Sequence, residues 1–261
     1  MKQSVFLTAV IIITAAVAMG IYMFVLGNPA NFADGETKQV PLKGNLLGTI
    51  YTGGIVVPVL ITLTLMNVTL IFERTFSLRK ANGRGPIPSF LKTIQTHLMS
   101  GKMDDAIKAC DAQRGSAANI IRTGLLRYKD IHQDKSLDAE KKMAETKRAI
   151  EEATSLETPL LERNLIALST IASVATMFGL LGTVVGMIRA FTALAAAGGA
   201  PDAIQLSIGI SEALINTALG LLAAIIGIIA YNFFVTKVDN FTYMIDEASY
   251  NVVEILNTKT T

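Results

Sequence analysis

Four long stretches without a charged side chain constrain the fold of this chain more than any other feature. Two of them, Leu165–Ile188 and Ala213–Thr236, have 24 residues each. A helix of that length rises by about 36 Å, whereas the hydrocarbon core of a bilayer is about 30 Å thick. The stretches Val5–Leu26 and Gly44–Phe72 are equally free of charge, and 51% of all residues are hydrophobic. The sequence therefore predicts an all-α integral membrane protein with four spans.

The basic residues are concentrated in one polar loop, which sets the predicted orientation. Of the 23 Lys and Arg residues, 17 lie between Arg74 and Arg163. Cytoplasmic loops carry an excess of such residues, so this loop and, with four spans, both termini are predicted to be cytoplasmic. Apolar positions recur at helical spacing in Ser89–Arg163. We therefore expect long transmembrane helices that extend into a cytoplasmic helical domain.

These boundaries divide the chain into eight segments. In order they are an extra N-terminal transmembrane helix (1–27), a periplasmic connection (28–45), a transmembrane helix (46–73), the cytoplasmic helical domain (74–163), a transmembrane helix (164–193), a periplasmic loop (194–203), a transmembrane helix (204–236) and a cytoplasmic C-terminal helix (237–261). Pro58 lies inside the second span and is expected to bend it or remove a backbone bond. The C-terminal segment is expected to be amphipathic, with Val238, Phe241, Ile245, Ala248 and Val252 on one face.

The first apolar run has two interpretations. Ala16-Val17-Ala18 resembles a signal-peptidase site, which favours a cleaved leader. The run Val5–Leu26 is also long enough to span the bilayer behind Lys2. We favour an uncleaved span with Lys2 on the cytoplasmic side.

The third span carries a line of hydroxyl groups. Ser169, Ser173, Thr176 and Thr183 are separated by four, three and seven residues, which places them within an arc of about 80° on a helix. They can line a polar path, or each can bond back to a carbonyl of its own helix. Small residues suited to close helix packing accompany them in the third and fourth spans: Gly179, Gly182, Gly186 and Gly220.

The fourth span begins with a carboxylate in an apolar setting. Glu212 is followed by Asn216 and Thr217 about one turn later. An ionisable group at the edge of a bilayer must face protein or water, so Glu212 is a candidate functional residue. Glu212 and Thr217 lie about 140° apart on an ideal helix, so one of them is expected to face a neighbouring helix or subunit. Arg189, at the outer end of the third span, has Asp202 as its expected neighbour across a short loop.

The sequence contains no familiar enzyme signature. Its two histidines, His97 and His132, are far apart in the polar loop, and its single cysteine, Cys110, has no partner for a disulfide. It has no phosphate-binding loop, and the basic loop lacks interleaved aromatic residues typical of nucleic-acid binding. We expect no cofactor and no metal site. Polar groups inside the membrane remain as the available chemistry.

Two motifs resemble the ExbB/TolQ/MotA family of proton-driven motor subunits. The first is GLLGTVVG at residues 179–186, followed by Met187 and Phe191, and the second is GISEALINTALG at residues 209–220. The order of a span, a large cytoplasmic loop and a hairpin of two spans is also similar from about Leu46 onward. The span at Val5–Leu26 is additional to the usual three, and Asn216 stands where the family often has alanine.

The resemblance implies a non-enzymatic subunit of a motor powered by the proton gradient. Family members form a pentamer around two copies of a smaller ExbD- or TolR-like subunit that supplies an intramembrane aspartate. The family's pore-facing threonines match Thr183 and Thr217, and its glutamate matches Glu212. Together with Thr176, Ser173 and Asn216 they are the predicted proton-pathway residues, and Glu212 either carries protons or surrounds the partner's aspartate with polarity.

The resemblance favours one cellular role for the motor, an ExbB-like role, over several alternatives. An ExbB-like subunit energises TonB-like proteins for outer-membrane transport from the bacterial inner membrane. A TolQ-like subunit uses the same mechanism for envelope maintenance. A small-solute transporter predicts internal repeats, which are not evident in the sequence, and a structural scaffold predicts that Glu212 has no part in proton flow.

Overall fold

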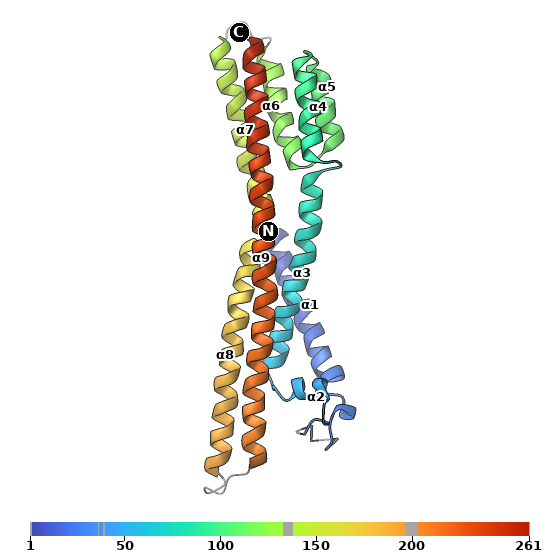
Figure 1. Cartoon of the computed structure of the whole chain (residues 1–261), viewed down its shortest axis with the longest axis vertical. Helices are drawn as coiled ribbons and strands as arrows, with labels where there is room; N and C mark the ends of the chain where they lie inside the picture. The colour runs from blue at the N-terminus through green and yellow to red at the C-terminus, as the bar shows by residue number, and fades with distance from the viewer. Residues whose placement is uncertain (1, 36, 39, 133–137, 197–202, 261) are drawn as a thin grey trace. The chain divides into compact units, whose positions relative to one another are not determined.

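Within the residues that the structure describes, the chain consists of helices, connecting turns and loops, and one isolated β-bridge between Phe32 and Pro41. This computed structural model describes residues 2–35, 37–38, 40–132, 138–196 and 203–260 (Figure 1). The elements are α1 (Lys2–Gly20), the π-helix η1 (Ile21–Leu26), the 3₁₀-helix η2 (Pro29–Asn31), α2 (Leu46–Tyr51), α3 (Val56–Asn82), α4 (Ile87–Met99), α5 (Met103–Gln113), α6 (Ser116–His132), α7 (Ala139–Glu162), α8 (Leu165–Ala196) and α9 (Ala203–Thr260). The predicted all-α class is confirmed.

Within the described residues, four regions are long and apolar enough to cross a membrane. They lie within Val5–Leu26, Val56–Met99, Ala139–Ala195 and Leu206–Thr258. The predicted number of spans, including the extra one at the N-terminus, is therefore confirmed. The chain forms two compact units. The membrane unit comprises Met1–Phe72 and Ile166–Asn232, and the polar unit comprises Glu73–Leu165 and Phe233–Thr261.

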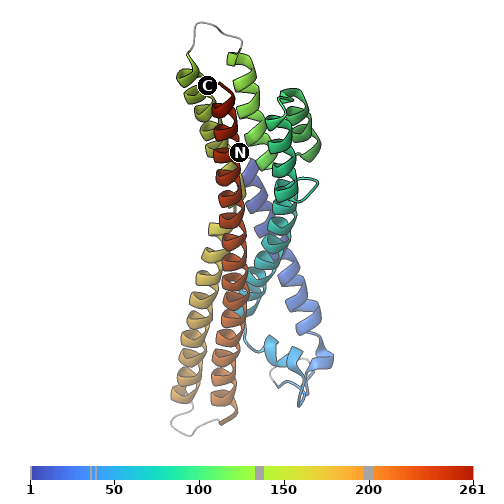
Figure 2. The same cartoon turned by 45° about the horizontal axis from the view of Figure 1, so that its top comes forward.

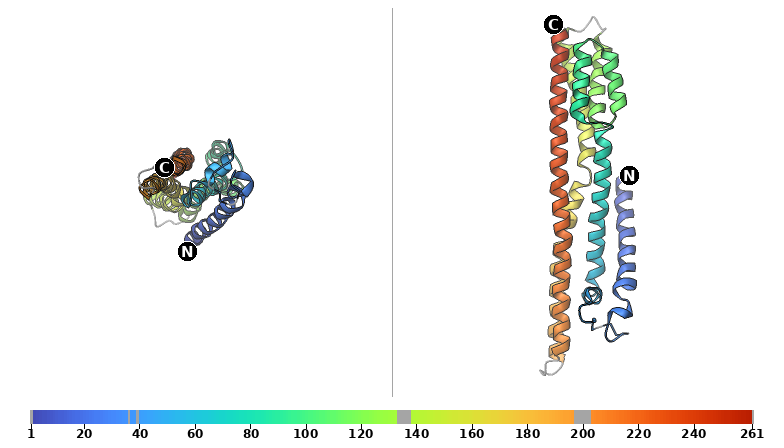
Figure 3. Two further views of the ribbon diagram at one scale, coloured as in Figure 1. Left: turned by 90° about the horizontal axis from the view of Figure 1, so that it is seen from below. Right: turned by 45° about the vertical axis from the view of Figure 1, so that its right-hand side comes forward.

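In the membrane unit, α8 and the first part of α9 form an antiparallel hairpin (Figure 2). The helix α1 runs beside α3, with η1 and α2 at the end away from the N-terminus (Figure 3). Among the α1 side chains that the structure describes, those of residues 5–20, a narrow stripe of Val10, Thr14 and Ala18 is buried, while Ile11–Ile13 are exposed. Apolar side chains exposed in this way suit lipid or partner helices. Asp202, the expected neighbour of Arg189, lies outside the described residues.

The second span differs from the continuous helix that the sequence predicts. The short helix α2 ends at Tyr51, and α3 begins at Val56 after four residues of turn in which Gly54 has φ +72°. Pro58 lies in the first turn of α3, where a backbone N–H has no partner within the helix. The prediction that Pro58 bends the span is therefore wrong, because the interruption precedes the proline and proline suits a helix start.

In the polar unit, the end of α9 packs with the four helices α4 to α7. One apolar cluster includes residues of α4, α5 and α6, such as Ile94, Cys110 and Leu125, with Val252 and Leu256 of α9. The predicted apolar face of the C-terminal segment is buried: Val238, Phe241, Ile245, Ala248 and Val252. This segment is a continuation of α9 because neither glycine nor proline interrupts residues 228–260.

A buried ion pair marks the junction between α7 and α8. Arg74 is fully buried, and its guanidinium donates two hydrogen bonds to Glu73, at 2.7 and 2.8 Å, and one to the Leu161 carbonyl at 3.2 Å. Asn164, with φ +62°, separates the two helices and donates to Glu73 at 3.1 Å. Hydrogen bonds from two sides thus compensate the burial of this charge pair.

We expect the Cys110 thiol to be unreactive in the folded protein. Burial raises its pKa to about 12, with a further contribution from the nearby Asp111 carboxylate. At pH 8 only about one thiol in ten thousand is then ionised, against roughly a quarter for a free cysteine. Maleimide should label Cys110 only after unfolding, while a Ser100→Cys variant at an exposed position of the same unit should label at once. Rapid native labelling of Cys110 would contradict its burial.

Candidate functional site

The hairpin of α8 and α9 is held by direct backbone contact. A Cβ atom added to Gly220 would lie 2.7 Å from the Gly179 Cα atom and 2.7 Å from the Ala175 carbonyl oxygen. Added to Gly186, it would lie 2.8 Å from the Ala213 nitrogen. Side chains larger than hydrogen therefore do not fit at these positions, and the two helices approach at the distance that such small residues allow. At Gly182, the space that a Cβ atom would need is occupied by the side chain of Asn216.

This contact brings two hydroxyl groups together across the hairpin. The Oγ1 atoms of Thr183 and Thr217 are 2.5 Å apart. Both hydroxyls also lie within hydrogen-bond distance of the Gly179 carbonyl oxygen, at 3.2 and 3.3 Å. Each hydroxyl has one hydrogen to donate and two lone pairs to accept with. The pair can therefore rearrange its donors and still bond a third group placed beside it.

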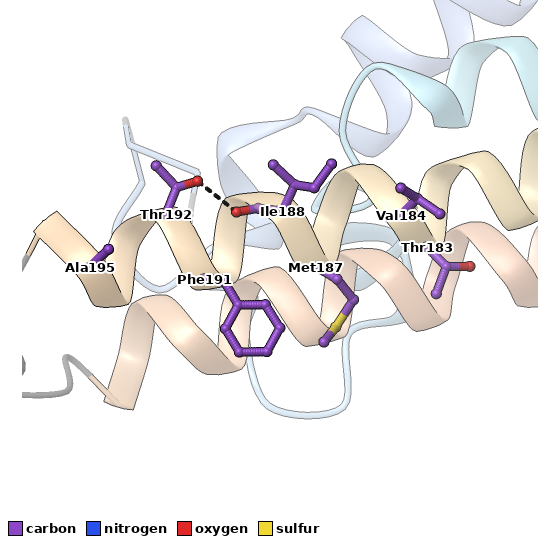
Figure 4. A pocket seen from close by; sticks show the side chains of 7 residues that line it. All are labelled: Thr183, Val184, Met187, Ile188, Phe191, Thr192 and Ala195. Carbon is purple, nitrogen blue, oxygen red and sulfur yellow. Dashed lines mark hydrogen bonds between the residues drawn. The ribbon is translucent and has the colours of Figure 1, made fainter.

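Thr183 lies at one end of a shallow groove along α8 (Figure 4), and Thr217 adjoins this end through its contact with Thr183. Its lining is mostly apolar: Thr183, Val184, Met187, Ile188, Phe191, Thr192 and Ala195. Val184, Ile188 and Phe191 are each more than half exposed in the single chain. Such a surface in a membrane needs to be covered by lipid or by another helix.

The remaining hydroxyls of the third span bond within their own helix. Ser173 donates to the Ser169 carbonyl at 3.1 Å, and Thr176 donates to the Ala172 carbonyl at 3.2 Å. Ser169 donates to the Ile166 carbonyl in the same manner. Their donors are thus satisfied locally, as in one of the two readings of the sequence, and their free lone pairs remain as acceptors. Ser173 is exposed, while Thr176 is half-buried.

A second polar group, an ion pair, lies further toward the loop end of the hairpin. The Arg189 Nη1 atom of α8 lies 2.5 Å from the Glu212 Oε1 atom of α9. The carboxylate side chain is only 7% exposed, whereas that of Arg189 is 54% exposed. Glu212 is thus a buried carboxylate whose charge is balanced by a guanidinium that reaches the surface.

Asn216 belongs to neither the hydroxyl pair nor the exposed groove. Its side chain is fully buried, and its Nδ2 atom donates to the Gly53 carbonyl at 2.9 Å. Its Oδ1 atom is buried and has no hydrogen-bond partner among the described residues. On α3, Asn67 is bonded in the same way, since its Nδ2 atom donates to the Ala223 carbonyl of α9 at 2.9 Å. The two amides tie the second span to the hairpin.

The predicted residues therefore form two layers. Thr183 and Thr217 meet at the groove, and Ser173 and Thr176 continue along α8 from there. Glu212 and Asn216 lie among the helices of the chain. Sequence reasoning missed the pairing of Arg189 with Glu212. The glycine seams contained the signal, because Gly186 against Ala213 sets a register in which Arg189 reaches Glu212 within the next turn.

These features define a multi-pass helical membrane protein with polar groups between its spans. The profile of the MotA/TolQ/ExbB proton channel family matches residues 113–247. This chain belongs to that family, whose members are proton channels and not enzymes.

Relatives from several bacteria agree with this assignment. The Tol-Pal system protein TolQ of Pseudomonas aeruginosa is 32% identical over 179 residues, which cover 67% of this chain and 76% of the relative. A putative biopolymer transport protein, ExbB-like 3, of Synechocystis is 30% identical over 184 residues, covering 70% of this chain and 81% of the relative. The biopolymer transport protein ExbB of Xanthomonas campestris is 38% identical over 104 residues, covering 37% and 40%.

The ion pair of Arg189 and Glu212 leads to a prediction about stability. Arg189→Gln leaves the buried Glu212 carboxylate without its counter-charge, so it should lower the melting temperature of the detergent-purified chain more than the double change Arg189→Gln with Glu212→Gln. Because Arg189 is half exposed, we expect a coupling of about 1–2 kcal/mol between the two positions. Simple addition of the two single effects would contradict a direct ion pair.

Proposed function

We propose that this chain is a subunit of a proton-driven motor whose assembled spans enclose a proton path. The observation that carries the proposal is the pair of Thr183 and Thr217 hydroxyls at the end of an exposed apolar groove. Hydroxyls both donate and accept, so a proton or a protonated carboxyl group can pass them without meeting an unpaired charge.

The path is lined, in this proposal, by Thr183 and Thr217, with Thr176 and Ser173 along the same helix. Glu212 and Asn216 lie behind this lining. Because Arg189 already balances Glu212, the carboxylate is better suited to fix the local field than to pick up and release a proton at each step. The mobile proton then needs a carboxylate from elsewhere.

A partner supplies that carboxylate in this account. We infer a pentamer of this chain around two copies of an ExbD-like or TolR-like subunit with one span and an intramembrane aspartate. A single chain offers too little wall to enclose a path, and the exposed residues Val184, Ile188 and Phe191 provide a surface for such a span. The partner's aspartate would meet the hydroxyl pair at the end of the groove.

The proposed output is ExbB-like. The motor would energise a TonB-like protein, and through it outer-membrane transport, from the bacterial inner membrane with both termini cytoplasmic. The concentration of basic residues between Arg74 and Arg163 supports this orientation. A TolQ-like output in the Tol-Pal envelope system is the second candidate, since a TolQ protein is among the relatives covered over most of their length.

Gene deletion distinguishes the two outputs in cells. Loss of siderophore-type uptake with an intact outer membrane supports the ExbB-like output. A leaky outer membrane with normal uptake supports the TolQ-like output. A solute transporter or a scaffold predicts neither phenotype.

Proton flux tests the path itself. In cells that contain the chain and its partner, Thr183→Val keeps the shape of the side chain but removes its hydroxyl, and should lower proton flux about tenfold, as expected for the loss of one hydrogen bond in a low dielectric. Thr217→Val should have a similar effect, and Glu212→Gln should also reduce flux by disturbing the ion pair.

Thr192→Val is the matched control for these variants. Thr192 lines the same groove, is exposed and bonds only to the Ile188 carbonyl among the contacts described, so its hydroxyl has no place in the proposed path. Its flux should stay near that of the unchanged protein. Unchanged flux in both Thr183→Val and Glu212→Gln would exclude the motor and favour a scaffold.

A further inference from the structure

The interruption of the second span lies directly against the ion pair of Arg189 and Glu212. The turn comprises Thr52, Gly53, Gly54 and Ile55, between α2 and α3. The N–H groups of Thr52, Gly53 and Gly54 all donate to carbonyls of α2, at 3.1–3.2 Å. Irregular backbone in an apolar segment is tolerated where its polar groups are satisfied by protein, and here they are.

One side of this turn contacts the hairpin. The Gly53 carbonyl accepts the hydrogen bond from Asn216 at 2.9 Å. A Cβ atom added to Gly54 would lie 2.6 Å from the Glu212 Oε1 atom and 3.3 Å from the Arg189 Nη1 atom. Gly54 also has φ +72°, a conformation that side chains with a Cβ rarely adopt. The backbone of the turn thus forms one wall of the ion pair.

The other side of the turn contacts the extra N-terminal span. The rings of Tyr22, in η1, and Tyr51, at the end of α2, are stacked with their centroids 4.6 Å apart. The Tyr22 hydroxyl donates to the Tyr51 carbonyl at 3.4 Å, and Phe32 packs edge-on against Tyr51 at 5.4 Å. Tyr51 is therefore held by two aromatic residues of the N-terminal segment.

We propose that the turn 52–55 is a positioning element for Glu212 and Arg189, and that the N-terminal span holds this element in place through the contact of Tyr22 with Tyr51. Its effect on proton flux rests on the function proposed above, whereas its structural part does not. Asn216 is then a positioning residue that binds the turn, and the extra span acts on the polar site through one short chain of contacts.

Two observations favour this role over packing alone. Asn216 keeps a buried Oδ1 atom without a partner, which is unfavourable for a residue with no other task than filling space beside Gly182. The extra span also buries little of its own surface, and its ring stacking with α2 lies at its η1 end. Among the described residues, Arg189 of α8 is paired with Glu212, and Tyr22 of η1 lies within electrostatic range of both.

Hydrogen exchange on the full purified chain tests the structural part directly. Tyr22→Leu removes the stacked ring, so exchange of the amides of residues 52–55 should become about tenfold faster. Tyr22→Phe keeps the ring and loses only the 3.4 Å hydrogen bond, and should restore most of the protection. Val10→Ala weakens the same span away from the turn and should leave these amides unchanged.

Unchanged exchange in Tyr22→Leu, or an equal increase in Val10→Ala, would overturn the proposal. This result does not depend on whether the protein conducts protons. Absence of flux in the unchanged protein would instead overturn the proposed function and leave the exchange result to decide the positioning role.

Proton flux tests the functional part with a matched pair of glycines. Gly54→Ala should lower flux about tenfold because its Cβ atom displaces the Glu212 carboxylate. Gly44→Ala imposes a similar backbone strain at φ +79° but has no atom within 4 Å of the added Cβ, so flux should be unchanged. An equal loss of proton flux in both variants would mean that backbone strain, and not contact with Glu212, causes the effect.

A double-mutant cycle then tests whether Tyr22 and Asn216 affect proton flux through the same turn. If Tyr22 and Asn216 act through the same element, Tyr22→Leu combined with Asn216→Ala should lower flux about as much as either change alone. Multiplied losses would mean that the two residues act independently, which contradicts the proposal.

Discussion

The close approach of the α8 and α9 backbones at Gly179 and Gly220 is the contact on which the rest of the membrane unit depends. It sets the register of the hairpin, and each step along α8 is then matched by a step back along α9. The same register places Thr183 beside Thr217 and Arg189 beside Glu212. A side chain at either glycine would separate the helices and break both polar pairs at once. The glycine contact between the two helices, which involves no polar side chain, thus determines where the polar side chains meet.

The two polar pairs divide the chemistry between them. The hydroxyl pair borders an exposed groove and carries no net charge, so it suits a surface past which protons move. The Glu212 carboxylate is buried against the backbone at Gly54 and has Arg189 as its counter-charge, so the ion pair suits a fixed element of the electrostatic field. This arrangement favours the interpretation of Glu212 as a polar surround for a partner's carboxylate over that of a proton carrier.

Much of this organisation follows from the sequence, and the exceptions have physical causes. Uncharged length predicts the four apolar helices, and small-residue periodicity indicates the faces on which α8 and α9 meet. The pairing of Arg189 with Glu212 was not predicted because proximity along the chain favours Asp202, which lies outside the described residues, whereas helix register favours Glu212. The turn before α3 was missed because Pro58 is a stronger local signal than Gly53-Gly54, although proline is well tolerated in a first turn. Contacts such as Tyr22 with Tyr51 join residues far apart in sequence and have no local signature.

The central claim is that the Thr183 and Thr217 hydroxyls face a lumen shared by several copies of the chain. An electron cryo-microscopy map of the assembly purified from its own membrane, with its partner bound, tests this most directly. The account predicts that both threonines face the central lumen at the level of the partner's aspartate, with Arg189 and Glu212 paired behind them. A map in which the groove along α8 faces the lipid, or in which the chain is a monomer, would contradict it.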